Sequence, residues 1–588
     1  MSLRLGAVLL ALALAAGLPI QASADDRSDA ILAAKGFDFE GNDSPPDLVD
    51  ENSMPTVGDA PGTGVSIESP GRRRGVQVNN PALDNIQFFP DALPQPQRPF
   101  ELSIQSETSA AAFGDDVVVG FNNSADQPVV QLPDGKLAFV HRFLSAVGTS
   151  HDGGRTWTES SLPPIPGSPF TSGDPAVTVD RSGNFYYASL GADAPGHSLV
   201  FVGKSTDRGT TFHPGVTVAV DPGVDKEWIG AGPDPLHPER DNVYVTWTSF
   251  KADSSELHFS RSTDGGQTWS AAQTLFAPVK TTLVSAFIQF SNTVVDRESG
   301  RLYVPFLHGG AGSADFIKVL ISDDGGLTFR FSNFNVPGAP DTTAFPNVTP
   351  GTLADCGLSG GRRLVLHVGL DLGGGRFGLP VFRNATRLIT QPSTVVQRGK
   401  VFIAYNASTS PTAGDPKSRS EIRLLFSPNG GSTWRGPVVV ARATTSEPQH
   451  VHPAVSVNES GSRVTVGYYS QLASGQLQVN AATADVDGEE SRFTLGDRQV
   501  KHLGPPFDLT PSNNPLSDPF PAHTTTNYDR TIRPCYDIGE YMTATRSLGT
   551  TVLAYGDNRN SWVSPPQSPV PGTHSQPDVF ANRFNPND

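Results

Sequence analysis

Several carboxylates stand at the start of short apolar runs, and these are the residues whose chemistry we consider first. Two carboxyl groups held near each other can hydrolyse a glycosidic bond, one as the acid and the other as base or nucleophile. Six residues are our catalytic candidates: Glu107, Asp174, Asp225, Glu227, Glu540 and Tyr541. A fold that gathers the starts of these runs around one opening would bring them together as a largely acidic ring.

Other polar residues occupy the same kind of position and extend this ring, namely Lys226, Gln289, Gln391, His450 and His452. On a strand, the imidazoles of His450 and His452 would share one face and could ligate a metal, but the pattern supplies no third ligand. A carboxylate ring suits Ca²⁺, although the chain has no loop of the EF-hand type, so the metal stays unassigned. The alternative for every ring member is a structural hydrogen bond to backbone groups.

Arginine is the residue type that would recognise an acidic substrate, because its planar fork pairs with a carboxylate through two hydrogen bonds. Our candidates for substrate binding are Arg142, His452 and Arg559. Four more arginines could converge with them: Arg363, Arg383, Arg530 and Arg533. No motif selects among these arginines.

The elements that must position these side chains are indicated by one phrase that occurs five times. The copies cover residues 150–157, 205–212, 262–269, 322–329 and 427–434. Asp followed by Gly favours a tight turn, Ser and Thr hydroxyls can bond the backbone groups of that turn, and the final Trp or Phe anchors the next strand. Recurrence at this spacing predicts a repeat architecture of antiparallel sheets.

The phrase, S-x-D-x-G-x-T-[WF], resembles the Asp-box of the sialidase-like β-propellers, also called the bacterial neuraminidase repeat. The resemblance implies an all-β fold, a six- or seven-bladed β-propeller in which each Asp-box hairpin joins the outer two strands of a blade. It also implies a structural role, away from the central site, for the box residues Asp152, Asp207, Asp264, Asp324 and Asn429. Asn429 stands where the other copies have Asp.

Pairs of apolar runs separated by turns accompany the boxes, and each pair is typical of two adjacent strands. We count seven: 107–113 with 116–121, 174–180 with 184–188, 226–230 with 242–247, 287–296 with 301–305, 391–396 with 400–405, 452–457 with 463–468, and 540–544 with 551–555. Seven pairs favour seven blades, whereas the sialidases themselves have six, so both counts stay open. Radial closure would make residues 99–588 one domain, with insertions near 335–388 and 496–530.

The N-terminal part differs in character from the rest. Residues 1–24 combine a basic residue, a run rich in Leu and Ala and an Ala-x-Ala site, which is typical of a cleaved signal peptide rather than a membrane anchor. We therefore expect a secreted protein, extracellular or periplasmic. Residues 25–98 lack sustained periodicity and are predicted to be an extended or disordered leader, with a pro-segment or attachment arm as the alternative.

Composition narrows the range of partners. The net charge of −16 argues against nucleic-acid binding, and no run after the signal peptide reaches membrane length. Cys356 and Cys535 are the only cysteines, which excludes a disulfide scaffold and leaves one disulfide between them open. No cofactor is assigned, the expected partner is a glycan or glycoprotein, and the oligomeric state stays open.

Architecture alone does not determine the function. Sialidases clamp the substrate carboxylate with three arginines, and their first arginine usually stands in an Arg-Ile-Pro phrase that this chain lacks. This disfavours exo-sialidase activity, and no catalytic residue is carried over from the family. Three interpretations remain: a secreted glycoside hydrolase or lyase that uses the acidic ring, a propeller that binds glycan or protein without catalysis, and a surface-assembly protein.

Overall fold

The computed structural model describes residues 75–82, 105–123, 129–131, 137–139, 142–168, 170–193, 196–310, 315–336, 341–348, 370–373, 376–378, 386–387, 391–409, 419–474, 476–489, 492–496, 498–507, 536–537, 541–563 and 573–585. Every regular element within these residues is a β-strand, which confirms the expected all-β class. Accordingly, the described residues include no helix that is long and apolar enough to span a membrane.

Each of the first three sheets is built around four antiparallel strands in chain order. The first contains β2 (Gln105–Phe113), β3 (Asp116–Asn123), β7 (Ser145–Ser150) and β8 (Thr158–Ser161). The second contains β10 (Ala176–Val179), β11 (Phe185–Ala192), β12 (Ser198–Ser205) and β13 (Val216–Val220), and β9 (Phe170–Thr171) and β6 (Arg142–Phe143) extend it beside β11. The third contains β14 (Val224–Asp234), β15 (His237–Phe250), β16 (Ser255–Ser262) and β17 (Gln273–Phe276).

The next three strand groups follow the same order and are linked to one another by hydrogen bonds. In the fourth, β18 (Val284–Gln289) and β19 (Val294–Val295) both pair with β20 (Leu302–Gly310), followed by β21 (Asp315–Ser322) and β22 (Arg330–Phe331). The fifth contains β27 (Ser393–Gln397), β28 (Lys400–Ser408), β29 (Ser420–Ser427) and β30 (Arg435–Ala441). The sixth contains β31 (Gln449–Val457), β32 (Arg463–Gln471), β33 (Leu477–Glu489), β34 (Arg492–Leu495) and β35 (Gln499–His502). The strand β23 (Ala344–Val348) pairs with both β21 and β28 and so links the fourth group to the fifth.

The last sheet combines strands from both ends of the described chain. It contains β37 (Thr543–Ser547), β38 (Thr550–Val563), β39 (Thr573–Phe584) and the N-terminal β1 (Val76–Gln77). Val76 lies opposite Ala581 in β39, and the buried Val78 packs in one cluster with Val117 of the first sheet and Val579 of the last. Residues 75–82 of the predicted leader therefore bridge the last and first sheets. The predicted signal peptide lies outside the described residues.

All seven predicted strand pairs are antiparallel pairs in the structure: β2–β3, β10–β11, β14–β15, β18 and β19 with β20, β27–β28, β31–β32 and β37–β38. The second strands β3 and β20 are buried almost throughout, because other sheets cover both of their faces, whereas β15 begins with four exposed residues. This double burial explains their continuous apolar runs. Of the predicted insertions, 335–388 includes β23 and 496–530 begins with β35, while most of both lies outside the described residues.

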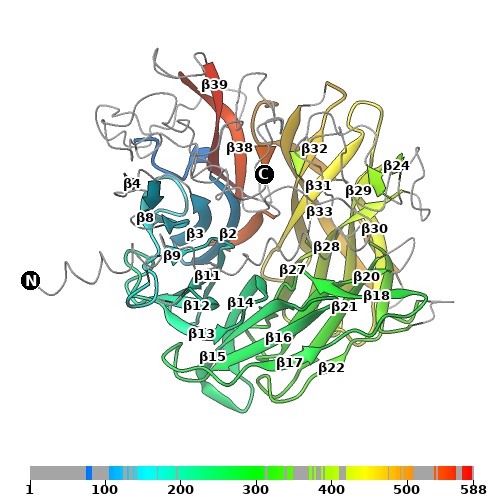
Figure 1. Cartoon of the computed structure of the whole chain (residues 1–588). Coiled ribbons are helices and arrows are strands. Elements are labelled where there is room, and N and C mark those ends of the chain that lie inside the picture. Colours follow the sequence, from blue (N-terminus) through cyan, green and yellow to red (C-terminus); the bar gives the residue numbers. More distant parts are fainter. Residues whose placement is uncertain are drawn as a thin grey trace, which may run out of the picture.

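The first strands of the seven groups contact one another in sequence. β2 contacts β10, β10 contacts β14, β14 contacts β19, β19 contacts β27, β27 contacts β31, β31 contacts β37, and β37 contacts β2. Figure 1 shows the sheets following one another around the molecule, from β2 and β3 through β14–β17 to β31–β33 and on to β38 and β39. The starts of the first strands are therefore neighbours in space.

Candidate functional site

A repeated irregularity of the backbone sets the geometry at the starts of the first strands. Five non-glycine residues there have positive φ: Glu107 (47°), Asp174 (53°), Lys226 (47°), Phe290 (60°) and His452 (52°). In β2, β14 and β31 they fall within a shift of the strand register. A bulge of this kind turns the side chain out of the regular alternation, and the left-handed conformation costs a non-glycine residue free energy. The same left-handed conformation thus recurs at five positions, and a register shift accompanies it in three of them.

Lys226 connects two of the candidate carboxylates. Its Nζ lies 2.9 Å from Asp174 Oδ1 and 3.6 Å from Glu107 Oε1. Asn122 at the end of β3 donates from Nδ2 to Glu107 Oε2 over 3.0 Å, and it accepts the backbone N–H of Asp174 over 3.1 Å. Glu107, Asp174 and Lys226 are at most 7% exposed. The three charges therefore neutralise one another in the interior, apart from one excess negative charge.

Asp225 and Tyr541 also form bonds within the protein. Gln289 donates from Nε2 to Asp225 Oδ2 over 2.7 Å. The Tyr541 hydroxyl donates to the carbonyl of Pro175 over 2.9 Å, and the Tyr541 ring meets the edge of Trp228 at 5.3 Å. Burial raises the pKa of Tyr541 well above its ordinary value, and nearby negative carboxylates raise it further. Tyr541 therefore stays a neutral phenol. Glu540 lies outside the described residues.

Glu227 differs from the other carboxylic acids at the centre. It is 1% exposed, and neither carboxyl oxygen has a hydrogen-bond partner in any other described residue. Burial raises its pKa well above the ordinary value, and the charge of Asp174 raises it further. Both effects favour the protonated form of this carboxyl group.

The two histidines of the predicted ring are buried and have separate surroundings. His450 Nδ1 lies 2.8 Å from Ser470 Oγ and Nε2 lies 3.1 Å from the carbonyl of Arg442, and burial lowers the His450 pKa to about 4. His452 donates its backbone N–H to Asn406 Oδ1 over 3.2 Å, and its ring meets the edge of Tyr469 at 5.7 Å. Gln391 is 5% exposed. In the described part of the chain, no three His, Cys, Asp or Glu side chains are arranged to hold a metal ion.

Arg559, one of the residues predicted to bind substrate, is held by groups within the protein. The Arg559 side chain is 9% exposed. Its guanidinium pairs with Asp557, donates to the Tyr555 hydroxyl over 3.0 Å and lies 4.3 Å from the centre of the Phe580 ring. Arg142 lies in β6. Outside the described residues lie Arg363, Arg383, Arg530 and Arg533, together with Cys356 and Cys535.

The five boxes form the turns that lead from the third to the fourth strand of five groups. In the first copy, Ser150 Oγ accepts the backbone N–H of Gly154 over 2.8 Å and donates to Asp152 Oδ1 over 2.8 Å. Thr156 donates its N–H to Oδ1 over 2.9 Å and its hydroxyl to Oδ2 over 2.7 Å. The same bonds recur around Asp207, Asp264 and Asp324. At Asn429, the Thr433 hydroxyl instead lies 3.2 Å from Oδ1, since the amide nitrogen replaces the second oxygen.

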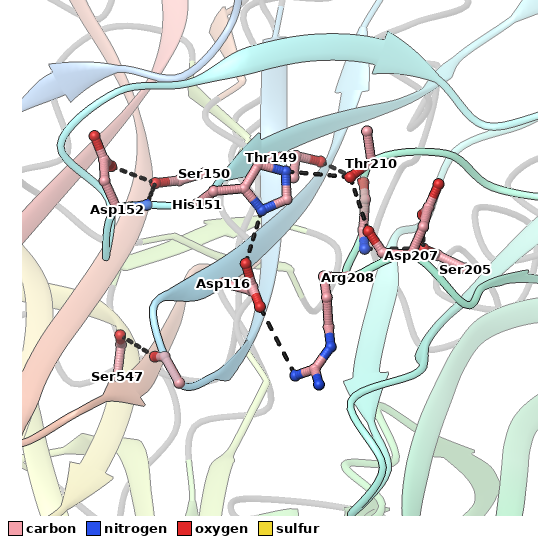
Figure 2. A network of polar contacts seen from close by, with 12 residues as sticks. Asp116, Thr149, Ser150, His151, Asp152, Ser205, Asp207, Arg208, Thr210 and Ser547 are labelled. Carbon is pink, nitrogen blue, oxygen red and sulfur yellow. Dashed lines mark hydrogen bonds and ion pairs between the residues drawn. The ribbon is translucent and has the colours of Figure 1, made fainter.

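A chain of polar contacts joins the first box to the second, as Figure 2 shows. His151 Nδ1 lies 2.7 Å from Asp116 Oδ1, and His151 Nε2 lies 3.2 Å from the Thr210 hydroxyl. Arg208 Nη1 is 3.9 Å from Asp116 Oδ2. The His151 side chain is 50% exposed, so this network lies on the surface and at a distance along the strands from the central cluster.

The comparison with known families agrees with the geometry of these turns. Residues 260–271 match the family model for the BNR/Asp-box repeat. The chain therefore contains the Asp-box repeat. The matched segment contains the third box, around Asp264, whose side chain accepts bonds from Ser262 and Thr268. This confirms the resemblance that the five phrases indicate.

The solved structures that match this chain share little of its sequence. A protein of unknown function from Dyadobacter fermentans is 13% identical, with 72% of this chain and 96% of that chain covered and a TM-score of 0.35. A Hadza microbial sialidase is 13% identical, with coverages of 76% and 73% and a TM-score of 0.37. A Trypanosoma rangeli sialidase is 11% identical, with 82% of this chain and 55% of the sialidase covered and a TM-score of 0.34. No curated protein matches the chain.

Sequence reasoning listed the central acids and Lys226 but missed the amides that hold them. Asn122 and Asn406 occupy the ends of second strands and accept the backbone N–H of Asp174 and His452 in the neighbouring groups. Their repeated position after an apolar run, in Gly120-Phe-Asn122 and Ala404-Tyr-Asn406, is the signal that could have identified them.

Proposed function

We propose that this Asp-box protein is an exported, seven-bladed β-propeller that binds a glycan or glycoprotein and does not hydrolyse it. Support for seven blades comes from the seven strand groups and from the contacts of their first strands, which pass through all seven and return to β2. Support for export comes from the character of residues 1–24. The glycan is the ligand class that the Asp-box resemblance implies.

The pairing of the central carboxylates carries the choice of binding over hydrolysis. A glycosidase needs two carboxyl groups that face the glycosidic bond. Here Glu107 and Asp174 are buried against Lys226, and Asp225 accepts from Gln289. Tyr541 donates to a backbone carbonyl and Arg559 pairs with Asp557. Groups paired in this way are held as parts of the scaffold and have little freedom to act on a sugar.

The test combines a hydrolysis assay with a binding assay on the same purified protein. We expect no product from a panel of chromogenic glycosides that includes a sialic acid conjugate, while a known glycosidase serves as the positive control. We expect saturable binding on a glycan array that is lost when the protein is unfolded. Hydrolysis that disappears in Asp174→Asn or Arg559→Lys would overturn the proposal, and so would the absence of binding to every glycan.

A further inference from the structure

Among the described residues at the centre of the molecule, Glu227 shares a single counter-charge with other carboxyl groups. Four carboxyl groups meet there with one ammonium group: Glu107, Asp174, Asp225 and Glu227 with Lys226. Lys226 Nζ lies 2.9 Å from Asp174 Oδ1 and 3.6 Å from Glu107 Oε1. An ionised Glu227 would therefore add a buried negative charge that the described residues do not fully compensate, which is unfavourable.

The local geometry of Glu227 in β14 agrees with a neutral carboxyl group. Both oxygens are buried and accept no hydrogen bond from any other described residue. An ionised carboxylate is an acceptor that buried sites normally satisfy with several donors. A neutral acid needs far less compensation when it leaves water.

The groups that face this carboxyl come from several elements. They are Asp225 and Lys226 on β14, Asp174 before β10, Tyr187 on β11 and Tyr541 before β37. Asp225 and Asp174 are acidic, and Lys226 is the ammonium group that already pairs with Asp174 and Glu107. Tyr187 and Tyr541 are phenols, and burial raises their pKa well above the ordinary value.

We propose that Glu227 holds a proton in the folded protein at neutral pH and acts as a pH-sensitive lock. When Glu227 loses that proton, the packing of β14 against the Asp174 segment and Tyr541 loosens. The ionised Glu227 would then repel the negative charges of its neighbours Asp174 and Asp225. Because Tyr541 bonds to Pro175 and packs on Trp228, loosening there would reach the second, third and last sheets together.

The direction of the pH effect follows from proton linkage. Burial, and then the charge of Asp174, raise the pKa of Glu227, while its own backbone N–H and Lys226 oppose them. The unfolded chain releases this proton near the ordinary glutamate pKa of about 4.3. The folded state is therefore at no disadvantage below that pH, and it loses stability as the pH rises above it, until Glu227 also ionises in the folded protein.

The decisive comparison is urea unfolding of the wild type and Glu227→Gln between pH 5 and 9. Glutamine keeps the shape and stays neutral, so we expect the wild-type folding constant to fall with pH more steeply than that of the variant, by up to about tenfold per pH unit. Glu239→Gln is the matched control, because Glu239 lies in the adjacent β15 with a side chain 73% exposed. This control should follow the wild type.

A second readout does not depend on whether the variant folds. Infrared spectra of the wild type in heavy water should contain the C=O band of a protonated carboxylic acid at neutral pH, and the band should vanish on alkaline titration. Absence of this band at neutral pH would overturn the proposal, as would equal pH slopes for the wild type and Glu227→Gln. Neither readout requires a ligand, so failure here is distinct from failure of the proposed function.

Discussion

At the scale of single residues, the centre of this protein is organised by backbone strain and by one buried lysine. Non-glycine residues in the left-handed region cost on the order of 1 kcal/mol or more each. Glycine would avoid this cost at Glu107, Asp174 and Lys226, so their side chains must contribute something that glycine lacks. The ion pairs that Lys226 makes with both acids supply that contribution.

We predict that Lys226→Met destabilises the protein by about 3–5 kcal/mol, because it leaves Glu107 and Asp174 buried without their shared counter-charge. Urea unfolding at pH 7 measures this change. Lys251→Met is the control, because the Lys251 side chain is 41% exposed and its ammonium group lies as far as 3.9 Å from the Glu256 carboxylate. This substitution should change the stability by less than about 1 kcal/mol. A similar small change in both variants would show that the central ion pairs contribute little.

At the scale of elements, the Asp box works as a hydrogen-bonded turn that directs the chain from the third strand to the fourth. Its carboxylate accepts two backbone N–H groups in the first, third and fourth copies, besides the hydroxyls of Ser and Thr. Burial raises the pKa of Asp152, Asp207 and Asp264, but these hydrogen bonds outweigh it and lower each pKa to about 2. The turn is therefore built around an ionised carboxylate.

From these lowered pKa values we predict that the boxes weaken in acid. Their contribution to stability is complete above the unfolded aspartate pKa of about 4 and is lost as the pH falls towards 2. Urea unfolding between pH 5 and 2 should show a shallower loss of stability for Asp264→Asn, which copies the natural Asn429 of the fifth box, than for the wild type. Identical profiles would mean that the box carboxylate does not contribute through its charge.

At the scale of the whole molecule, the described N-terminal segment joins the two ends of the chain. Val78 donates its N–H to the carbonyl of Val579 over 2.7 Å, and Asn79 donates from Nδ2 to Asp578 over 2.8 Å. Gly148 in the first sheet has no room for a side chain, because a Cβ there would stand 2.2 Å from Val78. Residues 75–82 thus fill a gap between the last and first sheets.

We predict that a chain that begins at residue 83 is less stable by about 3–5 kcal/mol than one that begins at residue 75. The truncation removes the burial of Val78 and several hydrogen bonds to β39. Thermal and urea unfolding of the two chains measure the difference. Equal stability would show that the segment is dispensable for the fold and would restore the pro-segment interpretation of the leader.

The sequence by itself determined the box turns and the strand pairs. Asp-Gly turns with Ser and Thr, as in 150–157, and apolar runs such as 116–121 act through local chemistry, so their structure can be deduced without knowing what lies nearby. The same reasoning listed the acids of the first strands, but it could not assign their partners.

Only the tertiary structure decided which of these groups meet. Lys226 joins Glu107 and Asp174 across three sheets, Glu227 loses its access to water, and β1 pairs with β39 nearly the whole length of the chain away. Desolvation and charge pairing arise when distant strands pack together, and a linear pattern carries no record of those distances. For this reason the fold of this Asp-box protein was predictable in outline, while the state of its central residues was not.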